Sequence, residues 1–222
     1  MTDLEKICAD AYEARVKIGT LDTDIKNKVL NDAADNLLKA EKEILEANKR
    51  DVATAEENMK AKSMIDRLSL DHDRLLGMAD GLRQIAKLAD PIGEVMSMAK
   101  RPNGLIIGKR RVAIGVVGII FEARPNVTSD AFGLCFKTGN CVILKGGSDA
   151  INTNIAIVKA LKKALTDNLV SAAALALIES TDRETTNAFM KMDQYVDVLI
   201  PRGGAGPVSY THLRAHETPE HL

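Results

Sequence analysis

The sequence predicts an α/β protein with a doubly wound parallel sheet of the nucleotide-binding type, preceded by an N-terminal helical layer and a β-hairpin arm. Two patterns carry this prediction. From Leu4 to about Leu88 the apolar residues recur at helical spacing. After Val112, continuous apolar runs alternate with helical patterns, which is typical of a parallel sheet covered on both faces.

Composition excludes several classes of protein. The 222 residues, 45% of them hydrophobic, can bury a core. Because 30 Lys and Arg balance 31 Asp and Glu, no net field would attract nucleic acid or anionic lipid, so a small-molecule partner is favoured. No apolar run approaches the roughly 20 residues of a membrane helix. Three irregularly spaced cysteines and no charged-then-apolar leader indicate a cytoplasmic protein.

The helical layer has a clear apolar stripe and clear boundaries. The stripe runs through Ile25, Val29, Ala33, Leu37 and Ile44. A later helix is expected to be capped by Asp71, to bury Leu75, Met78, Leu82 and Ile85, and to stop before Pro91 and Gly93. Packing explains these residues better than a functional site does.

The segment "VMSMAKRPNGLIIGKRRV" predicts a two-stranded arm. Asn103-Gly104 is the preferred pair where both central residues of a hairpin turn need positive φ. A lone hairpin is only marginally stable in water, so this one would pack on a neighbour or on a second subunit. A connecting loop with basic residues is the alternative.

The expected strands and helices after the arm alternate strictly. The strands are expected at 112–121, 141–145, 174–178 and 196–200, and the helices near 129–137, 149–165 and 182–192. In such a sheet ligands bind outside the carboxyl ends of the strands. Three strand ends therefore carry candidate ligand sites: "FEARPNV", "LKGGSDA" and "IPRGGAG".

The turn "LKGGSDA" suits a phosphate or ribose. Gly146 and Gly147 let the backbone approach a ligand, and Ser148 or Asp149 can cap the next helix, whose first amides suit an anion. Lys145 would add a charge or a ribose hydrogen bond. The pattern is neither G-x-G-x-x-G nor the Walker sequence, so a plain strand-to-helix turn explains it equally well.

In "FEARPNV", Pro125 fixes its own φ and restricts Arg124 to extended conformations. Asn126 would then be a rigidly placed amide donor, the group that stabilises an oxyanion in acyl chemistry, while Arg124 could bind a carboxylate or phosphate. The alternative is structural: Arg124 would pair with Glu122 or another acid at the surface, and Asn126 would cap the following helix.

A long resemblance joins these motifs. "VAIGVVGIIFEARPNVTSDAFGLCFKTGNCVILKGGSDA" resembles the γ-glutamyl phosphate reductases, also called glutamate-5-semialdehyde dehydrogenases, of the aldehyde dehydrogenase superfamily. "LRQIAKLADPIGEV", "RPNGLIIGKRRVAIG" and "DVLIPRGG" resemble the same family in the same order, so the similarity covers roughly residues 1–206.

The resemblance implies roles for individual residues. Asn126 would be the oxyanion donor and Arg124 would hold an anionic group of the substrate. Lys145 would bind the adenosine side of the nicotinamide cofactor, with Gly146, Gly147 and Ser148 in the turn after it. The turn in "IPRGG" that faces the cofactor would contain Gly203 and Gly204. No metal is implied.

The implied reaction is the second step of proline biosynthesis from glutamate. NADPH would reduce an enzyme-bound γ-glutamyl thioester formed from L-glutamyl 5-phosphate, releasing L-glutamate 5-semialdehyde. The preference for NADP over NAD comes mainly from the resemblance. Glutamate 5-kinase is implied as a candidate partner, and a homo-oligomer is implied for the full-length form.

The nucleophilic cysteine of the family lies in a second domain after the "IPRGG" strand. Cys8, Cys135 and Cys141 all read as buried apolar residues without a neighbour that would lower their pKa. The chain is therefore expected to be the cofactor-binding half of a reductase and to be inactive alone.

The expected organisation has four parts: a helical layer over 1–93, the arm over 94–111, the NADP-binding sheet over 112–206, and a tail over 207–222. The tail holds His212, His216 and His221, whose spacing suits a foreign or disordered segment better than a metal site. Two rival functions are kept: another aldehyde dehydrogenase-superfamily enzyme, such as an acylating one, and a non-catalytic nucleotide-binding or helical interaction protein.

Overall fold

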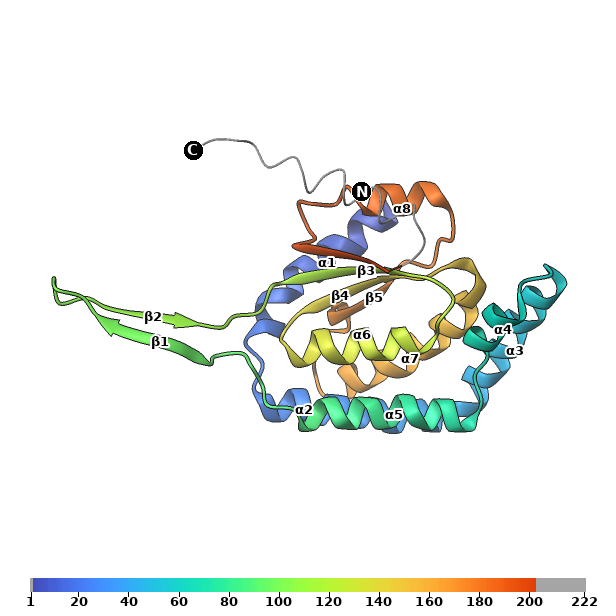
Figure 1. The fold of residues 1–222 in the computed structure, drawn as a ribbon, viewed down its shortest axis with the longest axis horizontal. Helices are drawn as coiled ribbons and strands as arrows, with labels where there is room; N and C mark the ends of the chain where they lie inside the picture. Colours follow the sequence, from blue (N-terminus) through green and yellow to red (C-terminus); the bar gives the residue numbers. More distant parts are fainter. Residues whose placement is uncertain (1, 203–222) are drawn as a thin grey trace.

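A computed structural model describes residues 2–202 of the chain. The strands form two sheets, and the helices precede and cover the larger one (Figure 1). The helices are α1 (Asp3–Gly19), α2 (Thr23–Lys39), α3 (Glu41–Glu57), α4 (Lys62–Leu68), α5 (His72–Lys87), α6 (Asn126–Lys137), α7 (Ile151–Asp167) and α8 (Arg183–Phe189). The strands are β1 (Val95–Lys100), β2 (Ile106–Arg110), β3 (Val116–Phe121), β4 (Cys141–Lys145), β5 (Leu175–Leu177) and β6 (Val198–Arg202).

The larger sheet has the strand order β5-β4-β3-β6, and every neighbouring pair is parallel. This confirms the predicted fold class. The predicted strand 112–121 begins later, at Val116, and the predicted helix near 129–137 begins earlier, at Asn126. Both differences lie at element ends, where periodicity carries least information.

Helices cover both faces of this sheet, but not as one N-terminal layer. α1 packs directly on β4, whereas α6 and α7 cover the opposite face, and α2 and α5 lie outside them (Figure 1). The arm leaves the body at the end where β3 begins, and α3 and α4 lie at the other end (Figure 1). The carboxyl ends of the strands therefore lie near α4.

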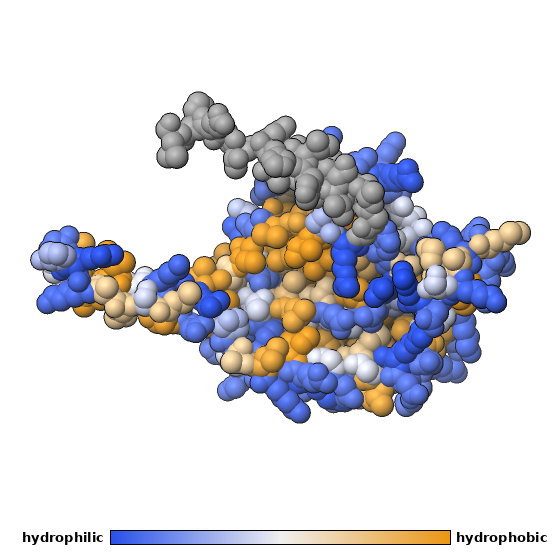
Figure 2. Space-filling view, viewed as in Figure 1, coloured by the Kyte–Doolittle hydropathy of each residue, from blue (hydrophilic) through white to orange (hydrophobic). Residues whose placement is uncertain are grey.

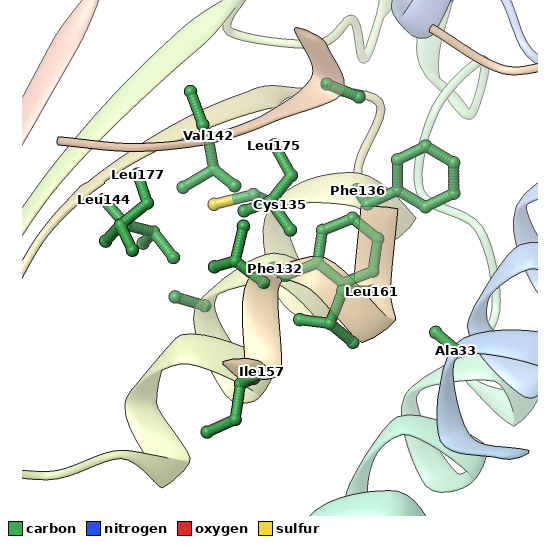
Figure 3. Close-up of a cluster of buried hydrophobic side chains, with 14 of the residues drawn as sticks. Ala33, Phe132, Cys135, Phe136, Val142, Leu144, Ile157, Leu161, Leu175 and Leu177 are labelled. Carbon is green, nitrogen blue, oxygen red and sulfur yellow. The ribbon is translucent and has the colours of Figure 1, made fainter. Parts of the chain in front are cut away.

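One apolar core joins the sheet to its helices. Phe132 and Phe136 of α6 stack with ring centroids 5.4 Å apart and are fully buried. Figure 3 shows them beside Leu161 of α7 and the side chains of β4 and β5. Burying an aromatic side chain of this kind contributes roughly 1.5–3 kcal/mol. This packing fixes the start of α6 relative to the strand ends.

The arm confirms the predicted hairpin but not the predicted turn. β1 and β2 pair antiparallel, and Gly104 has φ +87°. Asn103 does not have positive φ. The Gly104 amide donates to the Arg101 carbonyl at 2.9 Å, and the Arg101 amide donates to the Leu105 carbonyl at 2.8 Å. Pro102 therefore begins a type I turn that Gly104 closes in the left-handed region, which is the usual three-residue hairpin loop.

The stripe of α2 also differs from the prediction at one end. Val29, Ala33 and Leu37 are buried, but Ile25 is 38% exposed and the neighbouring Lys26 is only 1% exposed. The Lys26 ammonium lies 2.7 Å from the Asp90 carboxylate. A buried lysine needs such a partner, and Asp90 comes from a segment 64 residues away.

The predicted cap of α5 is confirmed, because Asp71 accepts a hydrogen bond from the Arg74 amide at 2.8 Å. The predicted cap of α7 is wrong. Neither Ser148 nor Asp149 caps α7, which begins after a short 3-10 turn. Asp51 of α3 takes this role instead, since its carboxylate accepts from the Thr153 amide at 2.8 Å and from the Thr153 hydroxyl at 2.6 Å.

The carboxylate of Asp51 therefore already binds the N-terminus of α7, where an anionic ligand was expected. Its other oxygen accepts from the Asn152 side chain at 2.7 Å. Asp51 is 3% exposed, so these bonds are shielded from water. This contact joins α3 to the turn that follows β4.

Within residues 2–202, no helix is both long and apolar enough to cross a membrane. In the same residues, no three or more His, Cys, Asp or Glu side chains gather as metal ligands do.

We expect Asp51→Ala to lower the free energy of unfolding by about 2 kcal/mol, because it leaves the Thr153 hydroxyl and amide without their partner. Urea denaturation would measure this. Lys49→Ala, on the exposed face of the same helix, serves as the control and should change stability by less than about 0.5 kcal/mol. Equal stabilities of the Asp51 variant and the wild type would contradict this account of the helix start.

Candidate functional site

The strand order reverses next to β3. The chain passes from β3 to β4 and β5 on one side and then returns to add β6 on the other side of β3. In open α/β sheets the crevice at such a reversal, outside the carboxyl ends of the strands, is the usual ligand site. Phe121 and Arg202 are register partners at this point.

A cavity of about 410 Å³ opens here. Its wall contains Phe121 and Arg124 after β3, Arg202 at the end of β6, and Arg67 of α4. A second cavity, also of about 410 Å³, shares Arg67 and Arg124 with the first and extends to Asn126 and α5. Arg67 and Arg124 therefore line both cavities.

Three arginines line the first cavity: Arg67, Arg124 and Arg202. Within residues 2–202, no side chain of Arg67, Arg124 or Arg202 makes a hydrogen bond or an ion pair with another residue. Among these residues Arg124 forms no ion pair with Glu122 or with another acid, so the structural alternative for Arg124 is wrong. Neighbouring guanidinium groups that are left unpaired favour an anionic ligand with several oxygen atoms.

Asn126 does not lie in a loop after Pro125. Pro125 has φ −56° and ψ −33°, already helical, and α6 starts at the next residue. The fixed φ of proline suits the first turn of a helix. Because Asn126 belongs to this turn, its side chain makes no capping hydrogen bond and projects along α6, donating to the Asp130 carboxylate at 3.1 Å. The capping alternative for Asn126 is therefore wrong.

Asn126 is exposed and lines the second cavity together with Arg124 and Asp130. Burial raises the pKa of the Asp130 carboxyl, whereas the hydrogen bond from Asn126 and the charge of Arg202 oppose that rise. An accessible amide donor next to unpaired cations could stabilise a developing negative charge on a substrate oxygen.

Lys145 lies at the carboxyl end of β4, paired in register with Ile120. It is 4% exposed, and its ammonium donates to the Gly146 carbonyl at 3.1 Å. Burial lowers the pKa of Lys145, and the charge of Asp182 acts in the opposite direction. Neither of the two cavities described above includes Lys145 in its wall.

The turn after Lys145 is built for close backbone approach. A Cβ on Gly146 would lie 2.5 Å from the Asn154 side-chain nitrogen, so a larger residue would force the buried Asn154 side chain to shift. Gly147 lies beside the Glu122 backbone, with 3.6 Å from a built Cβ to the Glu122 Cα, so the turns after β3 and β4 touch. Ser148 is exposed. The Asn154 amide nitrogen is buried and makes no hydrogen bond, although its oxygen accepts from Thr128 at 3.0 Å.

Gly203 and Gly204 lie outside the described residues, as does the predicted tail with its histidines. The structure therefore brings Arg124 and Asn126 together, with Lys145, Gly146, Gly147 and Ser148 at the neighbouring strand end. Sequence reasoning missed Arg67, Arg202, Asp130 and Asp51. Only Asp130 could have been found from the sequence, because it lies four residues after Asn126 and residues four apart on a helix are neighbours.

All three cysteines of the chain are buried. Burial raises the pKa of Cys8 to about 11 and that of Cys135 and of Cys141 to about 12. Figure 3 shows the Cys135 sulfur inside the core between α6 and β4. Because the thiolate is the nucleophile, these thiols are poorly suited to covalent catalysis, as the sequence predicted.

A parallel sheet with a polar cavity at its strand-order reversal is the architecture of a dinucleotide-binding protein. The sequence profile of the aldehyde dehydrogenase family matches residues 1–204, so the chain belongs to that family.

Within this family, the chain is similar to proteins named gamma-glutamyl phosphate reductase. The chain is 99% identical over 206 residues to the gamma-glutamyl phosphate reductase of Agathobacter rectalis, covering 93% of this chain and 49% of that protein. It is 53% identical over 203 residues to the one of a Thermoanaerobacter species, covering 91% and 49%. The crystal structure of gamma-glutamyl phosphate reductase from Thermotoga maritima superposes with a TM-score of 0.93 at 38% identity, covering 95% of this chain and 51% of that one.

The resemblance predicted from the sequence motifs is thus confirmed. The chain spans about half the length of the curated relatives that it matches.

We expect none of the three native thiols to react with a disulfide reagent such as DTNB within minutes at mildly alkaline pH, because burial keeps each one protonated and out of reach. Absorbance at the thionitrobenzoate band would count the reacted thiols, and unfolding in concentrated urea should release all three. Rapid labelling of Cys135 or Cys141 in the folded protein would show that a thiolate is accessible.

Proposed function

We propose that this chain forms the NADP-binding part of an enzyme that reduces L-glutamyl 5-phosphate to L-glutamate 5-semialdehyde and phosphate. The observation that carries the proposal is the exposed Asn126 amide beside Arg67 and Arg124, which form no ion pair within residues 2–202, at the edge where β3 and β6 end. An acyl phosphate brings a carbonyl oxygen and several anionic oxygens to such an edge. Relatives that are 99% and 53% identical to this chain carry the name of this activity.

Asn126 would act as the oxyanion donor. Its amide nitrogen is already oriented by Asp130 at 3.1 Å and would turn to the carbonyl oxygen of a bound acyl group. Loss of one such donor typically costs about 3 kcal/mol of transition-state stabilisation. Arg124 would hold an anionic group of the same substrate through its planar fork of donors.

The residues at the end of β4 fit a nicotinamide dinucleotide. Gly146 and Gly147 leave the backbone uncovered. The Lys145 ammonium, which now donates a hydrogen bond to the Gly146 carbonyl, could donate it to a ribose or phosphate oxygen instead. Ser148 is exposed beside them. Gly203 and Gly204 would face the same cofactor. When bound, NADPH supplies the hydride; the residues of this chain bind and orient it.

None of the cysteines described above would supply the thiolate that the family reaction uses. We therefore propose that this chain alone does not turn over L-glutamyl 5-phosphate, and that binding, rather than catalysis, is the activity to measure on it. Glutamate 5-kinase, which makes the acyl phosphate, is the partner that such a substrate implies.

Binding of NADPH tests the proposal directly. We expect the chain to quench and shift NADPH fluorescence saturably, and Lys145→Met to weaken that binding by tenfold or more, since a hydrogen bond to a charged group contributes about 1.5–3 kcal/mol. Met keeps the length of the buried stem, so the fold should persist. Lys159→Met, an exposed change on α7, is the matched control.

NADH measured in the same way tests the preference for the 2′-phosphate. We expect weaker binding of NADH than of NADPH. If the wild-type chain shows no saturable binding of either nucleotide, the proposal is wrong.

We also propose that the arm, residues 94–111, packs on a second copy of the chain. Met96, Met98, Leu105, Ile106 and Ile107 are 50–67% exposed although they are large and apolar. Figure 2 shows such residues interspersed with charged ones along the arm, away from the body. An isolated two-stranded hairpin is marginally stable, so a partner surface would explain its regular pairing.

The double change Met98→Lys with Ile107→Lys should lower the assembly to a monomer, because it places charges on the apolar surface of the arm. Light scattering coupled to size exclusion would report the mass. Lys109→Ala on the same arm is the control and should leave the mass unchanged. A wild-type chain that is monomeric at high concentration would contradict the proposed contact.

A further inference from the structure

The second cavity has a charge pattern that the proposed acyl chemistry uses only in part. It lies between α4, α5 and the first turn of α6, and its charged lining residues are Asp66, Arg67, Arg74, Arg124 and Asp130. Asp66 and Arg74 neutralise each other at 2.8 Å. Arg67, Arg124 and Asp130 remain.

Asp130 is the only one of these three with a close side-chain partner among the described residues, and that partner is the neutral Asn126 amide. Burial of this carboxylate costs desolvation energy and raises its pKa, and the charge of Arg202 opposes that rise only in part. A bound cation beside Asp130 would remove that cost. Two guanidinium groups nearby would at the same time favour a carboxylate.

A glycine keeps this cavity open. Gly77 lies in the interior of α5, where glycine costs about 1 kcal/mol relative to alanine. A Cβ built on Gly77 meets no atom within 4 Å, so α5 itself does not require glycine for packing. Any larger side chain here would project into the hollow that Arg67, Arg124 and Asp130 line.

We propose that this cavity binds the α-amino acid end of the substrate, with Arg67 and Arg124 on the α-carboxylate and Asp130 on the α-ammonium group. The inference rests on the proposed function and gives Arg67 and Asp130 a direct role in binding the substrate. Arg67 comes from the short helix α4, so the N-terminal helices would contribute directly to substrate recognition. The acyl end would then lie at Asn126, in the wall of the same cavity.

L-glutamate is a suitable probe because it carries the same α-amino acid end without the reactive phosphate. Isothermal titration of the wild-type chain with L-glutamate should show saturable binding. Glutarate lacks the ammonium group and γ-aminobutyrate lacks the α-carboxylate, so each should bind at least tenfold more weakly. Competition with inorganic phosphate distinguishes an amino-acid site from a site that binds any anion. We expect phosphate not to compete with L-glutamate.

Three variants test the named groups. Arg67→Ala and Asp130→Asn should each weaken L-glutamate binding by tenfold or more, and Gly77→Leu should abolish it by filling the cavity. Arg50→Ala, an exposed change on α3, is the matched control. Circular dichroism checks that each variant is folded. NADPH binding, which is proposed to involve other residues, is a second check.

The outcomes separate the two proposals. Loss of L-glutamate binding in these variants with NADPH binding retained supports the amino-acid site. No L-glutamate binding by the wild type, unchanged binding in Arg67→Ala or Asp130→Asn, or competition by phosphate overturns it while NADPH binding leaves the proposed function intact. If NADPH also fails to bind, the proposed function itself is wrong.

Discussion

The parallel pairing of β6 with β3 is the constraint on which the candidate site depends. Because Phe121 and Arg202 are register partners, the segment that follows β3 and the end of β6 meet at one edge. The turn after β4 reaches the same edge through its contact with Glu122. A change of one residue in this register would move Arg202 to the other face of the sheet, away from Arg67 and Arg124.

The helices outside the sheet do more than cover it. α3 supplies Asp51, whose carboxylate binds the start of α7 and so fixes the turn that carries Gly146 and Gly147. α4 supplies Arg67 to the cavities at the strand ends. The N-terminal third of the chain therefore builds part of the site, and its helices cannot be understood as packing alone.

Cationic side chains that pair with a carboxylate differ from those that are candidates for ligand binding. Lys26 is buried against Asp90, and Arg83 lies 2.8 Å from Asp35 and 2.9 Å from Asp80. Such pairs satisfy the charges that the fold places near one another. Arg67 and Arg124 have no such pairing among the described residues, and both are exposed beside cavities. Unpaired cations gathered at one edge repel each other, which a bound anion would offset.

The sequence by itself determined the alternation of strands and helices, the hairpin, the cap at Asp71 and the motifs around Asn126 and Lys145. These features depend on neighbours within a few positions, so periodicity, glycine and proline report them. Tertiary structure alone decided that Lys26 rather than Ile25 is buried, that Asp51 caps α7, and that Arg67 and Arg202 join Arg124. Each of those contacts links residues distant in the chain, and only the packed arrangement of strands and helices brings such residues within bonding distance.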